Sequence, residues 1–349
     1  MKILFVTGYD AWTQISRGIK PSHHLFGIHQ LIDHYEKRED GSIQGVLKKD
    51  AIKGADGGTV DFYIWESVRK GVTKHLSYML KEGNKYDLIY DCLNRCSVWL
   101  GIYKMLGIFK PKVITIMHHP SYKIGLNFSH SDAYIFFNEE YKKIGIKDCR
   151  RKQNIYYVNE WYPDTVWYDG IDGISNDVDA YFLDNGKTER DRELMISSAN
   201  KAKVRIDYPG NENESTGYAR RYKVDLSDYT EMTRRMRAYK CLVVPVKKFK
   251  KPKIGPLGIT SFLDCIALKI PVITSDNTCF ADDIEKYGLG IAYKTGNEQE
   301  LSDALIRMKC DKEFYSQCCK NIEVYSRNKT IFEYGENVKR IINATIQNV

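Results

Sequence analysis

The sequence predicts an α/β protein of two doubly wound domains, each a parallel sheet with helices on both faces. Three observations lead to this prediction. The 349 residues suit two domains of about 150 to 180 residues better than a single core. Short apolar strands alternate with helical stretches in both halves of the chain. A connector rich in Trp, Tyr, Asp and Gly joins the halves near residues 155–178.

The first domain, residues 1–158, is predicted to begin with a strand at Lys2–Thr7 and a helix from near Ser22 to about His34. Residues 38–58 are polar, glycine-rich and without periodicity, so we expect a mobile insertion there. Further strands are predicted at Val60–Trp65, Asp87–Asp91, Lys112–Met117 and Ala133–Phe137.

The second domain, residues 159–328, is predicted to contain strands at Asp179–Asp184, Lys203–Tyr208, Cys241–Val246, Pro271–Thr274 and Gly290–Tyr293. From Asp311 onwards the pattern indicates two helices, and the last occupies residues 329–349. Apolar positions in this last helix recur near helical spacing, which predicts packing on a domain face. They are Phe332, Tyr334, Val338, Ile341, Ile342 and Ile346.

Composition narrows the class of protein. The apolar run at the start is too short for a signal peptide, and no stretch approaches the roughly 18 apolar residues of a membrane span. Nine scattered cysteines form neither a disulfide framework nor a CxxC pair, and no cluster of Cys and His indicates a metal site. We therefore expect a cytoplasmic protein.

The formal charge of +8 is concentrated in two basic clusters, within residues 142–152 and 247–253. Such clusters meet nucleic acid, anionic lipid or phosphorylated substrates, or they form a solvated surface. No nucleic-acid-binding motif accompanies them, so we expect no nucleic-acid partner. An anionic membrane surface or a diphosphate-linked acceptor is the better functional interpretation.

Residues 254–276 carry the strongest functional signal. A glycine-containing loop leads into a helix whose first turn holds Gly258, Thr260 and Ser261, and a buried strand follows. The free N–H groups of a helix start favour an anionic ligand such as phosphate. Asp264 lies one turn further on, where a carboxylate can accept hydrogen bonds from sugar hydroxyls. The stretch therefore indicates a nucleotide-sugar site.

Three other segments follow predicted strands. The loop with Gly186, Lys187 and Arg190 opens a helix, a placement suited to a diphosphate, although cations at a helix start are also often simply exposed. His118 and His119 end a strand, where a histidine can contact a sugar hydroxyl, exchange a proton or cap a loop. Ser22, His23 and His24 follow the first strand, and Ser22 is also a plausible N-cap.

The stretch 254–276 resembles the donor-site signature of GT-B glycosyltransferases, especially family 4. In that family two glutamates, eight residues apart, precede Ala-x-Gly-x-Pro-Val. Ala267, Pro271 and Val272 match, Asp264 takes the place of the second glutamate, and Pro256 occupies the place of the first. The resemblance implies two Rossmann-like domains facing across a cleft, with the last helix crossing back to the first domain.

The resemblance also implies roles for the residues. Lys187 stands at the place of the family's loop arginine, and Arg190 is the second cation on the donor diphosphate. The amides around Gly258, Thr260 and Ser261 would assist them, Asp264 would hold the ribose, and His118 or His119 would contact the donor sugar. Ser22, His23 and His24 match an acceptor-facing loop.

The implied reaction is transfer of a sugar, typically a hexose, from a UDP- or GDP-linked donor to an acceptor hydroxyl, with retention of configuration. The acceptor would be a glycan or lipid-linked saccharide of bacterial surface polysaccharide synthesis, at the inner face of the membrane. We interpret Asp177-Val178-Asp179 as a chance Asp-x-Asp match and expect metal-independent binding. Two alternatives are a nucleotide-sugar epimerase of the same fold and a non-catalytic GT-B subunit that stabilises a partner transferase. Pro256, in the place of the first glutamate, favours the non-catalytic subunit.

Overall fold

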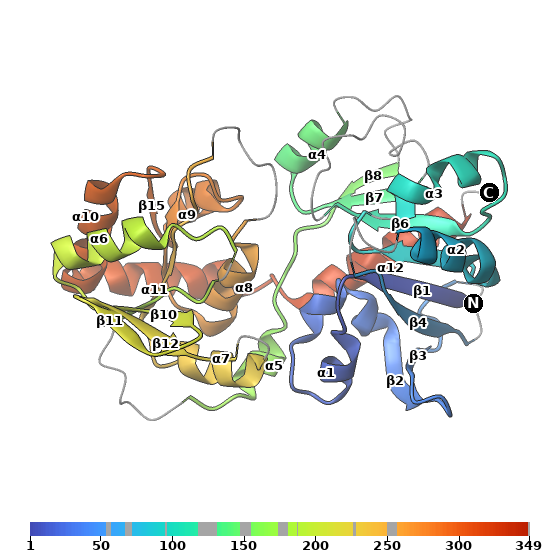
Figure 1. Cartoon of the computed structure of the whole chain (residues 1–349), viewed down its shortest axis with the longest axis horizontal. Helices are drawn as coiled ribbons and strands as arrows, with labels where there is room; N and C mark the ends of the chain where they lie inside the picture. The colour runs from blue at the N-terminus through green and yellow to red at the C-terminus, as the bar shows by residue number, and fades with distance from the viewer. Residues whose placement is uncertain are drawn as a thin grey trace. The chain divides into compact units, whose positions relative to one another are not determined.

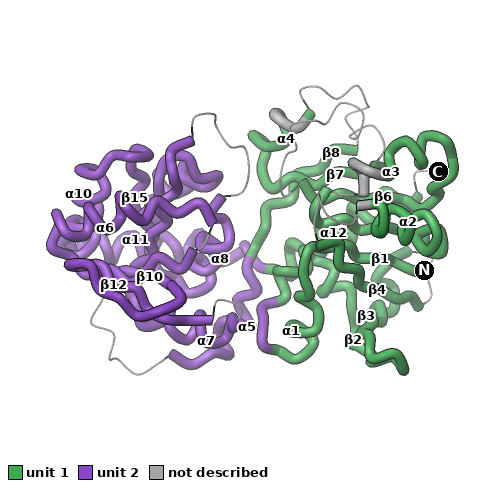
Figure 2. The backbone as a smooth tube through the Cα atoms, in the orientation of Figure 1, with its two compact units in different colours: residues 1–18, 22–162, 331–349 green, residues 19–21, 163–330 purple. Residues whose placement is uncertain are grey.

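The structure is a computed structural model that describes residues 1–53, 57–66, 72–94, 96–117, 131–146, 155–173, 181–186, 188–225, 228–249 and 257–347. The chain forms two compact units (Figures 1 and 2). Unit 1 comprises residues 1–18, 22–162 and 331–349, and unit 2 comprises residues 19–21 and 163–330. The C-terminal helix thus belongs to the same unit as the first strand.

Unit 1 is built on an eight-stranded sheet in the order β2-β3-β4-β1-β5-β6-β7-β8. All neighbours from β4 to β8 pair in parallel, whereas β2, β3 and β4 pair antiparallel at one edge. The strands are β1 Lys2–Thr7, β2 Ile32–Lys37, β3 Ile43–Leu47, β4 Thr59–Ile64, β5 Leu88–Asp91, β6 Lys112–Ile116, β7 Ala133–Phe136 and β8 Tyr156–Val158.

The helices of unit 1 flank this sheet. They are α1 Trp12–Ser16, α2 Val72–Glu82, α3 Cys96–Met105, α4 Glu139–Ile146 and α12 Ile331–Gln347, with 3₁₀ turns η1 Ser22–Leu25, η2 Ile28–Leu31 and η3 Gly83–Lys85. Leu4, Val6 and Ile89 of the sheet pack with Met79 of α2 and Leu100 of α3 in a buried apolar cluster.

Unit 2 is built on a seven-stranded sheet in the order β11-β12-β10-β9-β13-β14-β15. Only the pair β11 and β12 is antiparallel among these neighbours. The strands are β9 Phe182–Leu183, β10 Ile206–Gly210, β11 Glu214–Thr216, β12 Ala219–Lys223, β13 Cys241–Val244, β14 Val272–Ser275 and β15 Gly290–Tyr293.

The helices of unit 2 pack on the sheet through two buried apolar clusters. They are α5 Thr165–Asp169, α6 Arg192–Ala202, α7 Tyr229–Met236, α8 Ile259–Leu268, α9 Ala281–Tyr287, α10 Glu298–Cys310 and α11 Lys312–Ser326. One cluster joins Phe262 and Ile266 of α8 to Phe280 and Ile322, and the other joins Met195 of α6 to Leu305 of α10.

Two predictions for the N-terminal segment are wrong. The predicted helix from Ser22 to about His34 is two short 3₁₀ turns followed by β2, and Gly27 interrupts them with a left-handed φ of 81°. The predicted insertion at 38–58 contains β3, which pairs with β2 as an antiparallel hairpin. Strand β2 is the edge of the sheet and most of it is exposed, so it lacks the apolar run of a buried strand.

Most other predicted strands of the sheets are confirmed, and Gly290–Tyr293 has the predicted bounds. The edge strand β11 and its neighbour β12 were not predicted, because all of β11 is exposed and only two residues of β12 are buried. The two C-terminal helices are confirmed as α11 and α12. Within α12 the prediction for Phe332 is wrong, since its side chain is 56 % exposed.

Helix α12 packs against the rest of unit 1 at two glycines. A Cβ at Gly27 would lie 2.8 Å from Val338 Cγ2, and a Cβ at Gly335 would lie 2.5 Å from Gln30 Cβ. Asn159 Nδ2 also donates to the carbonyl of Tyr334 at 3.2 Å. The backbones therefore approach closely, and only glycine leaves room at these positions.

We expect Gly335→Val to lower the free energy of unfolding of the chain by about 2 kcal/mol, because the added side chain overpacks a contact with the Cβ of Gln30. Glu336→Val is the matched control, since residue 336 is exposed on the same helix. Its expected effect is within about 0.5 kcal/mol. Urea unfolding checks both, and equal losses in the two variants would contradict this packing.

Candidate functional site

In the sheet of unit 2, the order in which successive strands are added reverses at β9. The chain runs from β9 to β10 on one side and continues from β13 to β14 and β15 on the other. In open α/β sheets ligands bind beyond the carboxyl ends of the strands at such a switch point. An open pocket of about 560 Å³ lies here, between the loops that follow β9 and β13. Its lining residues are Glu189, Arg190, Asp191, Arg192, Glu193, Lys247 and Lys248.

Asp184, directly after β9, fixes the first of these loops. Its carboxylate is fully buried and accepts hydrogen bonds from the Gly186 amide at 2.9 Å and from Arg190 Nε at 3.0 Å. Arg192 Nε lies 3.8 Å from the other carboxylate oxygen. Burial raises the pKa of Asp184, and the charges of Arg190 and Arg192 oppose this rise.

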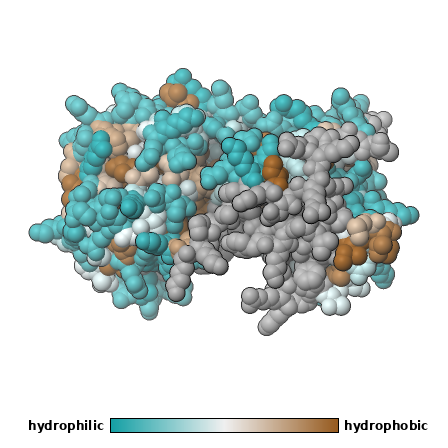
Figure 3. Space-filling view, turned by 90° about the horizontal axis from the view of Figure 1, so that it is seen from above, coloured by the Kyte–Doolittle hydropathy of each residue, from teal (hydrophilic) through white to brown (hydrophobic). Residues whose placement is uncertain are grey.

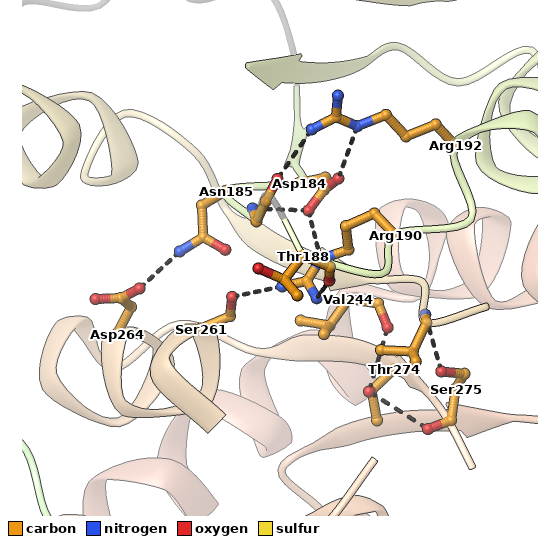
Figure 4. Close-up of polar contacts among 12 residues, drawn as sticks. Asp184, Asn185, Thr188, Arg190, Arg192, Val244, Ser261, Asp264, Thr274 and Ser275 are labelled. Carbon is orange, nitrogen blue, oxygen red and sulfur yellow. Dashed lines mark hydrogen bonds and ion pairs between the residues drawn. The ribbon is translucent and has the colours of Figure 1, made fainter. Parts of the chain in front are cut away.

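Arg190 ties this loop to helix α8. Besides Asp184, its guanidinium donates to the Thr188 carbonyl at 3.2 Å and to Ser261 Oγ at 2.9 Å (Figure 4). The side chain is only 4 % exposed, yet the residue lines the pocket. Three of the five guanidinium N–H groups are thus used within the protein.

Gly186 makes the position of this guanidinium possible. A Cβ at residue 186 would lie 2.0 Å from the nearest nitrogen of Arg190. Arg192 also donates to the Gly186 carbonyl at 2.9 Å, so the loop is held by arginines on two sides. In the predicted diphosphate loop, Gly186 therefore packs closely on Arg190. Lys187, the other predicted cation of this loop, lies outside the described residues.

The start of α8 faces this loop. Gly258 is its N-cap with φ 76°, and no side chain caps the helix. A Cβ at Gly258 would lie 2.7 Å from Val244 Cγ1, so glycine is needed both for the conformation and for the space. Thr260 is exposed, whereas Ser261 is buried and accepts from Arg190. Pro256 lies outside the described residues.

Asp264 is a buried hub one turn further along α8. Its carboxylate accepts from the Tyr168 hydroxyl at 2.5 Å, from Asn185 Nδ2 at 2.7 Å and from the Tyr229 hydroxyl at 3.4 Å. Burial raises the pKa of Asp264 to about 6, and the three hydrogen bonds oppose this rise. The predicted ribose ligand therefore joins α5, α7 and the loop after β9 to α8.

The remaining predicted site residues belong to the sequence of unit 1. Ser22, His23 and His24 form η1 and are all buried. Ser22 Oγ accepts from Gln30 Nε2 at 3.0 Å, and His24 Nδ1 lies 3.0 Å from the Tyr9 hydroxyl. The rings of His23 and His24 stack with their centroids 4.6 Å apart. His118 and His119 lie outside the described residues.

Sequence reasoning missed the residues that hold the site together, which are Asp184, Asn185, Arg192, Tyr168 and Tyr229. Asp184 could have been found as the acidic residue that directly follows the apolar strand β9. The two tyrosines had no signal beyond the aromatic content of their segments. No group of three or more His, Cys, Asp or Glu side chains in the described residues could hold a metal ion. None of the described helices is both long and apolar enough to span a membrane.

Comparisons with known proteins identify the fold. No family model matches the chain, and no curated protein matches its sequence. HepE of Anabaena, solved with UDP and glucose, superposes with a TM-score of 0.68 at 11 % identity, covering 99 % of this chain and 100 % of that one. The chain has the GT-B fold.

Two further solved structures of the GT-B type are similar over the whole length. A glycosyltransferase of Rickettsia africae gives a TM-score of 0.64 at 10 % identity, covering 100 % of this chain and 99 % of that one. The lipopolysaccharide outer core galactosyltransferase WaaB, in its apo form, gives 0.58 at 14 % identity with 99 % of both chains covered. HepE has also been solved with UDP-glucose.

The pKa of Asp264 predicts a pH-dependent stability. An unfolded aspartate titrates near 3.8 and the folded one near 6, so the folded state holds the proton more tightly. This contribution is fully present below about pH 4 and is lost as pH rises through about 6. We expect the free energy of unfolding of the wild type, minus that of Asp264→Asn, to fall by about 2.4 kcal/mol between pH 4 and pH 7.

Urea unfolding at several pH values measures this difference. Asp282→Asn is the control, since Asp282 is exposed on α9 in the same unit and its difference should stay flat. A flat difference for Asp264→Asn as well would contradict the buried, raised carboxyl.

Proposed function

We propose that the chain is a glycosyltransferase that moves a sugar from a nucleoside diphosphate sugar to an acceptor hydroxyl. The observation that carries this proposal is the pocket at the switch point of unit 2, lined by Arg190, Arg192, Lys247 and Lys248 beyond the carboxyl ends of β9 and β13. Cations at this place in the sheet suit a diphosphate. The GT-B fold supports the proposal, and the UDP and UDP-glucose complexes of HepE favour a UDP-linked hexose over a GDP-linked one.

The catalytic contribution of unit 2 would be electrostatic. Negative charge develops on the leaving diphosphate as the bond to the sugar breaks, and preorganised donors at that point lower the barrier. Lys187 and Arg190 would supply positive charge. The backbone amides of Gly258, Thr260 and Ser261, at the N-terminus of α8, would donate hydrogen bonds to the diphosphate. Because Asp184 and Ser261 already fix Arg190, its guanidinium needs little rearrangement when the donor binds.

Asp264 would act on the nucleoside side of the donor. A carboxylate offers about four acceptor sites, and the donors Tyr168, Asn185 and Tyr229 occupy three of them. A ribose hydroxyl would take the fourth. Donor binding would need no metal ion, because the positive charge on the diphosphate comes from side chains and helix amides.

We further propose His118 or His119 as the contact to the donor sugar, and Ser22, His23 and His24 as the acceptor side. The acceptor would be a glycan or lipid-linked saccharide of bacterial surface polysaccharide synthesis, and the transfer would retain the anomeric configuration. These assignments rest on the family 4 resemblance. Nuclear magnetic resonance of the anomeric proton in the product tests the stereochemical course.

We expect UDP to raise the melting temperature of the full chain by roughly 5 °C at a concentration of about 100 times its Kd. Lys248→Ala should reduce this rise, because it removes a cation from the pocket lining. Lys187→Ala should reduce it as well, because we propose Lys187 as a cation that binds the diphosphate. Lys309→Ala is the matched control, since Lys309 is exposed on α10 of the same unit and away from the pocket lining.

Three outcomes decide between functions. If neither UDP nor GDP nor their sugars stabilise the chain, the transferase proposal is wrong and a non-catalytic subunit is favoured. Turnover of UDP-glucose with no acceptor present would instead favour an epimerase or a hydrolase. Transfer to an added acceptor, lost in Lys187→Ala, would establish the proposed activity.

A further inference from the structure

The end of helix α3 in unit 1 exposes an apolar surface. Ile102, Met105, Leu106 and Ile108 are 58, 62, 63 and 51 % exposed. Four large apolar side chains within seven residues are thus open to solvent, whereas most other exposed hydrophobic residues of the described chain are scattered singly. Figure 3 shows hydrophobic side chains gathered at the right-hand edge of the view, where α3 ends. We call these four residues the α3 patch.

The backbone of the α3 patch is firmly held. Gly107, with φ 71°, ends the helix as a left-handed cap. The Ile108 amide donates to the Tyr103 carbonyl at 2.8 Å and the Gly107 amide to the Lys104 carbonyl at 3.0 Å, which is the Schellman arrangement. The neighbouring Phe109 is only 1 % exposed, so the chain turns back into the core directly after the patch.

A second contact fixes the turn from outside the helix. Asn84 of η3 donates through Nδ2 to the Ile108 carbonyl at 3.0 Å and accepts from the Lys110 amide at 2.9 Å. The apolar side chains are therefore presented outward by a rigid cap. Keeping four such side chains in water is unfavourable, and an exposed patch of this kind marks an interaction site.

The charge around the patch identifies the partner. From Leu93 to Ser131 the sequence contains no Asp or Glu, and the basic residues of this stretch that the structure describes are Lys104, Lys110 and Lys112. Lys110, next to the patch, is exposed, and no carboxylate among the described residues pairs with it. Asp132 is already paired with Lys104 at 3.0 Å and lies 3.7 Å from Lys112, and Glu82, close to Asn84 in the sequence, is paired with Lys85.

We propose that the α3 patch docks the protein on an anionic lipid bilayer. The apolar side chains would enter the boundary between headgroups and acyl chains, and Lys110 would meet the headgroup phosphates. Basic residues around a small apolar surface are the combination that favours binding to anionic membranes. This proposal does not depend on the donor site of unit 2, because it concerns binding without any nucleotide sugar.

Sedimentation with vesicles tests the proposal. The full chain should bind vesicles of phosphatidylglycerol and phosphatidylcholine and should bind pure phosphatidylcholine vesicles much less. Leu106→Gln should lower the partition coefficient by about tenfold or more, since one largely exposed leucine no longer contributes its transfer free energy. Val324→Gln is the matched control, because Val324 is 60 % exposed on α11 of unit 2, and its binding should be unchanged.

A charge reversal at Lys110 measures the electrostatic contribution to vesicle binding separately from the apolar one. Lys110→Glu should weaken binding to the anionic vesicles severalfold, whereas Lys309→Glu, on α10, should not. Thermal unfolding of each variant checks that the exposed substitutions leave the fold intact. These four variants together distinguish the α3 patch from a general effect of charge or polarity.

Three results would overturn the proposal. One is no binding of the wild type to anionic vesicles. Another is unchanged binding in Leu106→Gln together with loss in Lys247→Glu/Lys248→Glu, which would move the membrane contact to that basic cluster. The third is a wild type that dimerises in solution and becomes monomeric in Leu106→Gln without vesicle binding, since the patch would then be an interface between copies of the chain.

Discussion

The buried ion pair between Asp184 and Arg190 is the interaction on which the candidate site depends. A fully buried carboxylate is tolerated only when it is paired and hydrogen-bonded, and Asp184 has a guanidinium and a backbone amide as donors. The same guanidinium reaches Ser261 in the first turn of α8. One side chain therefore sets the distance between the loop after β9 and the helix start, which together form the proposed anion-binding part of the site.

Glycines make this arrangement possible by allowing close approach. At Gly186 the backbone lies against the guanidinium of Arg190, and at Gly258 it lies against Val244 of β13. A methyl group at either position would push the loop away from the group that fixes it. The two glycines were interpreted from the sequence as phosphate-binding residues, and the structure gives each a packing reason as well. The two roles are compatible, because a close-packed backbone also brings its N–H groups near a ligand.

The parts of the fold and of the candidate site that could be predicted from the sequence are those whose pattern lies within a few consecutive residues. Strand β15 was predicted with its observed bounds because Gly290–Tyr293 is a short apolar run followed by a turn. The hairpin of β2 and β3 could not be, because β2 lies at an exposed sheet edge and carries polar side chains, and Gln44 and Gly45 interrupt the apolar residues of β3. Ser261 and Arg190 were each singled out, but their contact joins residues 71 positions apart, and no spacing rule predicts it. Tyr168 and Asp264 are 96 positions apart, so no spacing rule predicts their hydrogen bond either.

The two buried carboxylates of the site are stabilised in different ways, with different consequences. Asp184 faces the positive charges of Arg190 and Arg192, which oppose the effect of burial on its pKa. Asp264 is surrounded by neutral donors, two tyrosine hydroxyls and an amide, and its pKa rises to about 6. Neutral donors stabilise a carboxylate less than a guanidinium does. The contacts around Asp264 should therefore change with pH near 6, while those around Asp184 keep a permanent charge from Arg190. A ligand bridging both would be held at one end by a fixed cation and at the other by a group whose charge depends on the solution.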